Sequence, residues 1–186
     1  MDAIDAIYRR RAIRDYAPDP PARGELERLV EIAVQAPSGM NRQPWAFAIV
    51  LGRERLAQAS ALAKAALAPS AADLGPELAA MLASPEFDIF YNAPALIVVC
   101  ATEAGPMAVT DACLAAATLM IAAADSGLGT CWIGFAEAWL ASEAGRSWLA
   151  IPDDWRVVAP IIVGRPRGAP ERPARKAPTL VWVGEG

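Results

Sequence analysis

The sequence contains no histidine, and this absence removes several common kinds of active site. Without an imidazole there is no Ser-His-Asp or Cys-His catalysis, and the commonest zinc ligand is missing. Cysteine is also scarce. Cys100, Cys113 and Cys131 are odd in number and lack paired spacing, so they predict reduced, buried thiols and no disulfide framework. An enzyme of this composition must rely on a cofactor, on carboxylates, or on cysteine, lysine or tyrosine chemistry.

Positive charge is scarce in the middle of the chain, where residues 57–164 hold Lys64, Arg146 and Arg156 against eleven acidic residues. The whole chain has 17 basic and 21 acidic residues, a formal net charge of −4, which argues against nucleic-acid binding as its main role. The basic residues gather near the two ends, as Arg9, Arg10, Arg11 and Arg14, and as Arg165, Arg167, Arg172, Arg175 and Lys176. Two interpretations stay open: the groups converge on one anion, or both are solvated surface.

No apolar run is long enough to predict a membrane span. The longest, residues 112–124, lies between Asp111 and Asp125 and predicts a buried helix. The chain opens with a polar segment that has no signal-peptide pattern, so we expect a cytoplasmic protein that binds neither membrane nor nucleic acid. No repeat or linker divides the 186 residues. We expect one domain over residues 1–186, in which residues 164–186 form a C-terminal arm that reaches a partner subunit.

Hydrophobic periodicity predicts an α+β or α/β architecture, with one sheet covered by helices. The expected helices are residues 2–11, 23–36, 53–67, 76–83, 107–126 and 137–149. The expected strands are residues 45–51, 95–101, 130–134, 155–163 and 179–183.

A polar loop between the second helix and the first strand has residue types that suit ligand binding. Pro37 is expected to end the helix, and Gly39 to adopt a positive φ or to allow a close backbone approach. Pro44 predicts extended geometry at Gln43. On local chemistry alone the loop is either an ordinary connection or a binding element.

The Gly127-Leu128-Gly129 segment does not predict a dinucleotide site. A Rossmann fingerprint runs from strand through glycines to helix, whereas here a helix precedes the glycines and a strand follows. The glycines therefore predict a helix C-terminus. Cys131 follows closely and is interpreted as a core thiol, because no histidine is present to activate it.

Four segments give the strongest signal when they are taken together and in order. They are Arg10-Arg11-Ala12-Ile13-Arg14-Asp15-Tyr16; Ala36-Pro37-Ser38-Gly39-Met40-Asn41-Arg42-Gln43-Pro44-Trp45; Asp111 followed by Gly127-Leu128-Gly129-Thr130-Cys131-Trp132-Ile133-Gly134; and Val163-Gly164-Arg165-Pro166 with the basic tail. This order resembles the nitroreductase family of FMN-dependent oxidoreductases, whose first motif reads Arg-Arg-Ser-x-Arg-x-Phe. The resemblance extends over nearly the whole chain.

The resemblance implies a three-layer α+β fold, in which helices cover a central mixed, mainly antiparallel sheet. It also implies a homodimer with two FMN molecules at the subunit interface and an exchanged C-terminal strand. By position, the residues on the FMN phosphate and ribityl side would be Arg10, Arg11, Ala12 and Arg14, with Arg175, Arg172 or Lys176 completing the phosphate clamp. The flavin ring would meet Pro37, Ser38, Gly39 and Asn41 of the other subunit. It would also lie along Trp132, Ile133 and Gly134, with the N–H of Ile133 or Gly134 near flavin N5.

The implied activity is ping-pong transfer of a hydride from NADH or NADPH, through FMN, to a small oxidant such as a nitroaromatic, a quinone or an enone. Reduction leaves negative charge near flavin N1, which makes Arg14 a candidate stabiliser. No catalytic residue beyond the flavin, and no metal, is expected.

Two departures from the family pattern affect this interpretation. Ala12 replaces the usual serine and so loses one side-chain hydrogen bond to FMN. Residues 53–83 are short and lack the extra Asn and Lys that some members use at the ring, which leaves the substrate open. The alternatives are a specialised flavin enzyme (dehydrogenase, dehalogenase or flavin-cleaving), a low-turnover FMN carrier or sensor, and a scaffold whose arginines are surface charge.

Overall fold

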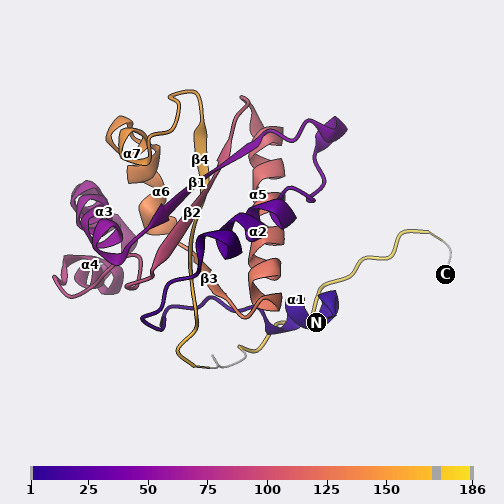
Figure 1. Cartoon of the computed structure of the whole chain (residues 1–186), viewed down its shortest axis with the longest axis horizontal. Helices are drawn as coiled ribbons and strands as arrows, with labels where there is room; N and C mark the ends of the chain where they lie inside the picture. The colour runs from indigo at the N-terminus through magenta and orange to yellow at the C-terminus, as the bar shows by residue number, and fades with distance from the viewer. Residues whose placement is uncertain (1, 169–172, 185–186) are drawn as a thin grey trace.

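A computed structural model describes residues 2–168 and 173–184 of the chain (Figure 1). Its helices are α1 (Ala3–Arg9), α2 (Arg23–Ala33), α3 (Arg53–Leu67), α4 (Pro76–Ala83), α5 (Pro106–Asp125), α6 (Gly134–Ala141) and α7 (Glu143–Leu149), with 3-10 helices η1 (Gly39–Asn41) and η2 (Ala68–Leu74). Its strands are β1 (Trp45–Leu51), β2 (Ala95–Ala101), β3 (Gly129–Trp132) and β4 (Arg156–Gly164). The strands form one sheet in the order β1-β2-β4-β3, and each neighbouring pair is antiparallel.

Strand β2 lies in the interior of the sheet and is buried on both faces. Leu96, Val98 and Cys100 join the core on one face, together with residues of α3 and α6. Ile97 and Val99 join the core on the other face, together with residues of α2 and α5. This alternation of side chains gives three layers, with α2 and α5 on one side of the sheet and α3, α4, α6 and α7 on the other (Figure 1). The expected three-layer α+β fold is confirmed.

Helix α5 is long and apolar enough to cross a membrane by length and composition alone. In the structure its buried residues, among them Ala112, Ala116 and Leu119, belong to the core between the helix and the sheet. The expectation of a buried helix for residues 112–124 is confirmed for the face that packs on the sheet and is wrong for the opposite face, where Leu114 is 40% exposed.

Helix α2 ends at Ala33, three residues earlier than expected from Pro37. The N–H of Gln35 donates to Ile32 O at 3.0 Å and that of Ala36 to Ala33 O at 3.1 Å. These i→i−3 bonds tighten the chain into a turn, which satisfies the backbone before the proline is reached.

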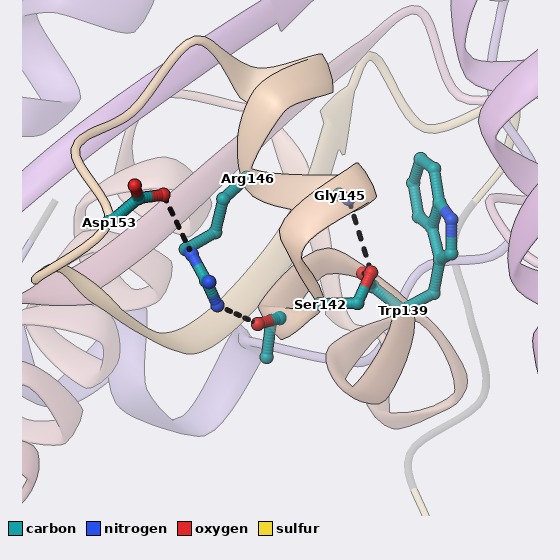
Figure 2. Close-up of polar contacts among 6 residues, drawn as sticks. Trp139, Ser142, Gly145, Arg146 and Asp153 are labelled. Carbon is teal, nitrogen blue, oxygen red and sulfur yellow. Dashed lines mark hydrogen bonds and ion pairs between the residues drawn. The ribbon is translucent and has the colours of Figure 1, made fainter.

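The single helix expected over residues 137–149 is wrong, because Ser142 separates two helices, α6 and α7 (Figure 2). The Ser142 hydroxyl donates to Trp139 O at 2.6 Å and accepts the N–H of Gly145 at 3.2 Å, so it ends α6 and caps α7. Gly145 packs against the end of α6, where a Cβ would lie 2.1 Å from Trp139 O. Figure 2 also shows Arg146 on α7 pointing toward Asp153. The Arg146 Nε lies 3.6 Å from Asp153 Oδ1.

Residues 179–183 were expected to form a strand, but they have no regular secondary structure within this single chain. The tail runs away from the body of the molecule (Figure 1), and its apolar side chains Leu180, Val181, Trp182 and Val183 are 67–95% exposed. A segment of this composition needs a partner strand in order to form regular structure, and the described part of this chain offers it none. Strand exchange with a second subunit therefore stays a prediction.

Candidate functional site

The arginine-rich segment that follows α1 is held in extended conformation against β3. Ala12 forms a parallel bridge with Thr130, and the N–H of Ile13 donates to Thr130 O at 2.9 Å. The buried hydroxyl of Tyr16 donates to Ile13 O at 2.7 Å. Burial raises the pKa of this phenol, so the hydroxyl stays protonated as a donor. Residues 10–14 are thereby fixed at one edge of the sheet.

A cavity of about 600 Å³ lies between this segment and the connection from α5 to β3. Its lining includes Arg9, Arg10, Arg11 and Thr130, opposite the glycine-containing turn at residues 127–129. The volume falls in the range of small-molecule sites, about 300–1,000 Å³, and guanidinium groups bind phosphate through paired N–H donors. The cavity can therefore hold an anionic ligand of cofactor size.

The glycine turn in this cavity ends α5, as expected. Gly127 has φ +74°, and the N–H of Leu128 donates to Ala123 O at 2.8 Å. This bond is typical of a helix C-terminus with a left-handed glycine.

A second cavity of about 240 Å³ lies where β3 leads into α6. Arg14, Tyr91 and Gly134 are among the residues that line it. The Arg14 guanidinium lies 5.6 Å from the centroid of the Tyr91 ring, a cation–π distance. Residues 129–130 line the first cavity and 131–135 the second, so the two follow one another along β3.

Cys131 lies in the wall of the second cavity as a free, buried thiol. Burial raises its pKa, and Arg14 and Arg10 oppose the rise. Cys100 is also free and buried, and burial raises its pKa to about 12. The expectation of buried thiols is wrong for Cys113, which is free but partly exposed on α5.

The two predicted backbone donors near the second cavity differ in their partners. The N–H of Ile133 donates to Pro160 O at 2.8 Å and so extends the antiparallel pairing of β3 with β4. Gly134 is the first residue of α6, and the N–H groups of a first helical turn have no acceptor within the helix. Of the two, Gly134 is the residue that can donate to a ligand. Trp132 beside them is partly buried.

The polar loop at residues 36–44 lies away from both cavities, near the start of α5. Gly39 packs against Met107 and Asp111 in the first turns of α5, whereas Ala124 in the last turn lines the arginine cavity. Ala124 lies thirteen positions after Asp111, which corresponds to roughly 20 Å along the helix. No residue of the loop lines either of the two cavities. Pro37 and Asn41 are exposed, and Ser38 and Gly39 are partly exposed. One chain thus does not bring the loop and the arginines together.

Of the two alternatives expected for Gly39, a positive φ is excluded, because the positive values belong to Met40 (53°), Asn41 (55°) and Gln43 (53°). A close backbone approach at Gly39 stays a prediction. The extended geometry expected at Gln43 is wrong. Gln43 is not extended because its N–H donates to Ser38 Oγ at 3.0 Å and its side-chain amide donates to Asn41 Oδ1 at 3.1 Å. Gly39 packs closely against α5, since a Cβ there would lie 2.6 Å from Sδ of the flexible Met107 side chain, which would have to move aside.

Two residues near these sites were not assigned a role from the sequence. Asp111 is 5% exposed, and both of its carboxylate oxygens lie 3.2 Å from the nitrogen of Gly39. A lone carboxylate within an apolar helical run was the signal available for it. Tyr91 lines the second cavity with φ +53°. Nothing in its local sequence indicates this placement.

The basic residues near the C-terminus have separate positions in the described part of the chain. Arg165 binds Glu25 at 2.8 Å, and Arg167 lies 3.4 Å from Asp15. Arg175 and Lys176 are exposed and do not line the arginine cavity. Arg172 lies outside the described residues. Within residues 2–168 and 173–184 no group of three His, Cys, Asp or Glu side chains is placed to hold a metal ion.

A family model described as the nitroreductase family matches residues 7–165. The chain belongs to the nitroreductase family. An Archaeoglobus fulgidus protein named "putative NADH dehydrogenase/NAD(P)H nitroreductase" is 30% identical over 171 residues, which cover 89% of this chain and 86% of that protein. Solved structures of FMN-bound nitroreductases match it as well. The one from Bacteroides fragilis has a TM-score of 0.86 at 24% identity, and the one from Desulfitobacterium hafniense 0.81 at 25%; each match covers 99% of this chain and 100% of the other.

Membership makes this nitroreductase-family chain an FMN-dependent oxidoreductase. The likeness of fold also explains why the four sequence segments occur in their order, since three of them form the two cavities and the fourth forms the loop on α5.

Proposed function

We propose that this nitroreductase-family protein binds FMN between two copies of the chain and transfers a hydride from NADH or NADPH to a small oxidant, such as a nitroaromatic, a quinone or an enone. The observation that carries the proposal is the separation of the loop from the arginine cavity along α5. A second copy of the chain can supply the loop that each site lacks.

The residues present fit FMN. In the larger cavity Arg10 and Arg11 can bind the phosphate, and the extended backbone at Ala12 can face the ribityl chain. In the smaller cavity Arg14 and the N–H of Gly134 can face the ring. The tail would add Arg175, Arg172 or Lys176 to the phosphate. The loop residues that would cover the ring from the partner subunit are Pro37, Ser38, Gly39 and Asn41.

Apolar surface on the single chain supports a homodimer. Ile4, Ile7 and Tyr8 on α1 are 55–60% exposed, and Met107 near the loop is 62% exposed. Surface of this kind is typical of a protein–protein interface. We assign both exposed groups to contact with a second copy of the chain, because Tyr8 lines the arginine cavity and Met107 packs against the loop at Gly39.

The free edge of the sheet supports the exchange of the C-terminal strand. The β3 edge is covered at Thr130 by the bridge to Ala12, whereas β1 pairs with β2 alone. Ile49 and Leu51 on β1 are 39% and 44% exposed. An unpaired strand edge is a template for another chain. The apolar segment at residues 179–183 of a partner would pair there.

When bound, FMN supplies the acceptor and then the donor for the hydride. Arg14 and the Gly134 amide at the start of α6 would hold the ring in the smaller cavity, and the positive charge of Arg14 would stabilise the negative charge that reduction adds. No protein acid or base is required, in keeping with a chain that lacks histidine. The smaller cavity can accept a nicotinamide and then an oxidant in turn, which gives a ping-pong scheme in the cytoplasm.

The proposal is tested by reducing the purified protein anaerobically. We expect a yellow protein whose colour is bleached by NADH or NADPH and returns with menadione, followed by turnover with a panel of nitroaromatics, quinones and enones. A colourless protein that cannot be loaded with FMN would contradict the assignment of the cavities. A yellow protein that neither nicotinamide bleaches would favour a specialised flavin enzyme or a carrier.

A further inference from the structure

Asp111 is a buried carboxylate on a helix whose other buried residues are all apolar. It accepts the N–H of Gly39 at 3.2 Å to each oxygen, and these two residues are 72 positions apart in the sequence. Burying a carboxylate costs solvation energy that one amide donor offsets only in part. A leucine has the same branched skeleton and would match the other buried residues of the helix, which are alanines and Leu119.

The loop that Asp111 holds has an unusual backbone. Met40, Asn41 and Gln43 all have φ near +55°, in the left-handed region that residues other than glycine rarely adopt. Such strained residues persist only where surrounding contacts fix them, and they cluster at functional sites. The loop therefore needs restraints that keep this conformation.

The restraints differ in where they act. The bonds from Gln43 to Ser38 and Asn41 lie within the loop, so they set its shape and not its position on the protein. The ion pair between Arg42 and Glu103, 2.7 Å apart, reaches another segment, but both side chains are solvent-exposed and such pairs contribute little. The bond from Asp111 is partly buried and joins the loop backbone directly to the long helix α5, whose apolar side chains pack in the core.

We propose that Asp111 is a positioning residue for the flavin site: its buried carboxylate fixes the strained loop at residues 38–43 in the place where that loop meets the FMN held by the partner's arginines. The inference rests on the proposed function. Asp111 acts through the loop and does not itself meet the cofactor. The carboxylate is retained in the core for the geometry of the site, at a cost to the stability of the chain.

The test compares three variants of the FMN-loaded protein. Asp111→Leu removes the acceptor, and Asp111→Asn keeps a carbonyl oxygen that can accept the Gly39 N–H. Leu119→Ala weakens the core of the same helix without touching the loop. Three quantities are measured: hydrogen exchange of the amides at residues 38–43, the band shape of the bound flavin in the visible spectrum, and kcat separately from KM.

In Asp111→Leu we expect Gly39 amide exchange to accelerate and kcat to fall, each about tenfold or more, because a hydrogen bond to a charged group is lost. The resolved shoulder of the flavin band should fade, while the arginines retain the FMN and Tm does not fall. Asp111→Asn should stay within about threefold of the wild type in both rates, since a neutral acceptor remains. Leu119→Ala should lower Tm and leave the loop exchange and the flavin band unchanged.

The proposal is overturned if Asp111→Leu matches the wild type in exchange and spectrum, or if Leu119→Ala reproduces all its effects. Failure of the proposed function is a different result, because it shows in the wild type as a protein that takes up no FMN or is not bleached by either nicotinamide. The exchange measurement reports on the tie between Asp111 and Gly39 whether or not FMN is bound.

Discussion

Gly129→Ala is expected to damage both the stability of the protein and its FMN site through one steric contact. A Cβ at position 129 would lie 2.7, 2.8 and 2.9 Å from three side-chain atoms of Ile13. Ile13 is buried and branched at Cβ, so a rotamer change offers little relief. The backbone at residues 10–14 must then move away from β3, and the hydrogen bond from Ile13 N to Thr130 O must lengthen.

Overpacking of this kind costs about 1–3 kcal/mol. For a chain of this length each kcal/mol corresponds to roughly 2–4 °C in Tm, so the expected fall is about 2–12 °C. FMN retention should fall as well, because the arginines that line the larger cavity lie on the displaced segment. Thermal unfolding and the ratio of flavin to protein absorbance after gel filtration measure the two effects.

Gly24→Ala is the matched control. Position 24 lies inside α2, and a Cβ there has no neighbour within 4 Å. Alanine favours a helix over glycine by about 1 kcal/mol, so Tm should hold or rise and FMN content should not change. Wild-type Tm and full FMN content in Gly129→Ala would refute the argument that Ile13 fixes the arginine segment on β3.

Two further predictions concern charged side chains. Arg14→Ala should raise the Kd for FMN by about 10- to 150-fold, because one charge-assisted hydrogen bond is lost. Arg28→Ala removes an arginine from an exposed ion pair on α2 and should leave the Kd unchanged. Stoichiometric FMN in Arg14→Ala after gel filtration would disprove the assignment of Arg14 to the FMN site. The backbone N–H of Ala22 and then the Arg165 guanidinium lower the pKa of Glu25, so its contribution to stability is present above the ordinary carboxyl pKa and is lost as the pH falls through the lowered one. Glu25→Gln should therefore reduce Tm at neutral pH and approach the wild type only as the pH falls through the lowered pKa; a Tm difference that does not depend on pH would contradict this.

Much of the fold could be predicted where local signals agree with tertiary packing. The bounds of β1, β2, α3 and α4 match the expected ranges, because each element is an apolar or amphipathic run that begins or ends beside glycine or proline. The prediction failed at Ser142, where a helix cap interrupts a continuous helical pattern. It failed again at Gln43, where side-chain hydrogen bonds prevail over the preference that Pro44 imposes. Both failures are short-range polar contacts that periodicity does not detect.

Some residues of the candidate site were also indicated by the sequence, and others were not. The arginine segment and residues 132–134 could be found because their residue types follow a recognisable motif, and the structure places them along one strand. Asp111 could not be assigned, because its partner Gly39 becomes a neighbour only when α5 packs beneath the loop. The predicted role of Arg175 and Lys176 at the phosphate stays a prediction, because within this chain both are exposed and neither lines the arginine cavity.

We propose that each FMN lies between two copies of the chain. Sedimentation velocity of the yellow protein, followed at a flavin wavelength and at a protein wavelength over a dilution series, tests it directly. We expect flavin absorbance to sediment with the dimer alone, at two FMN per dimer, and to appear as free FMN when dilution produces monomer. A monomer that sediments with tightly bound FMN would contradict the account.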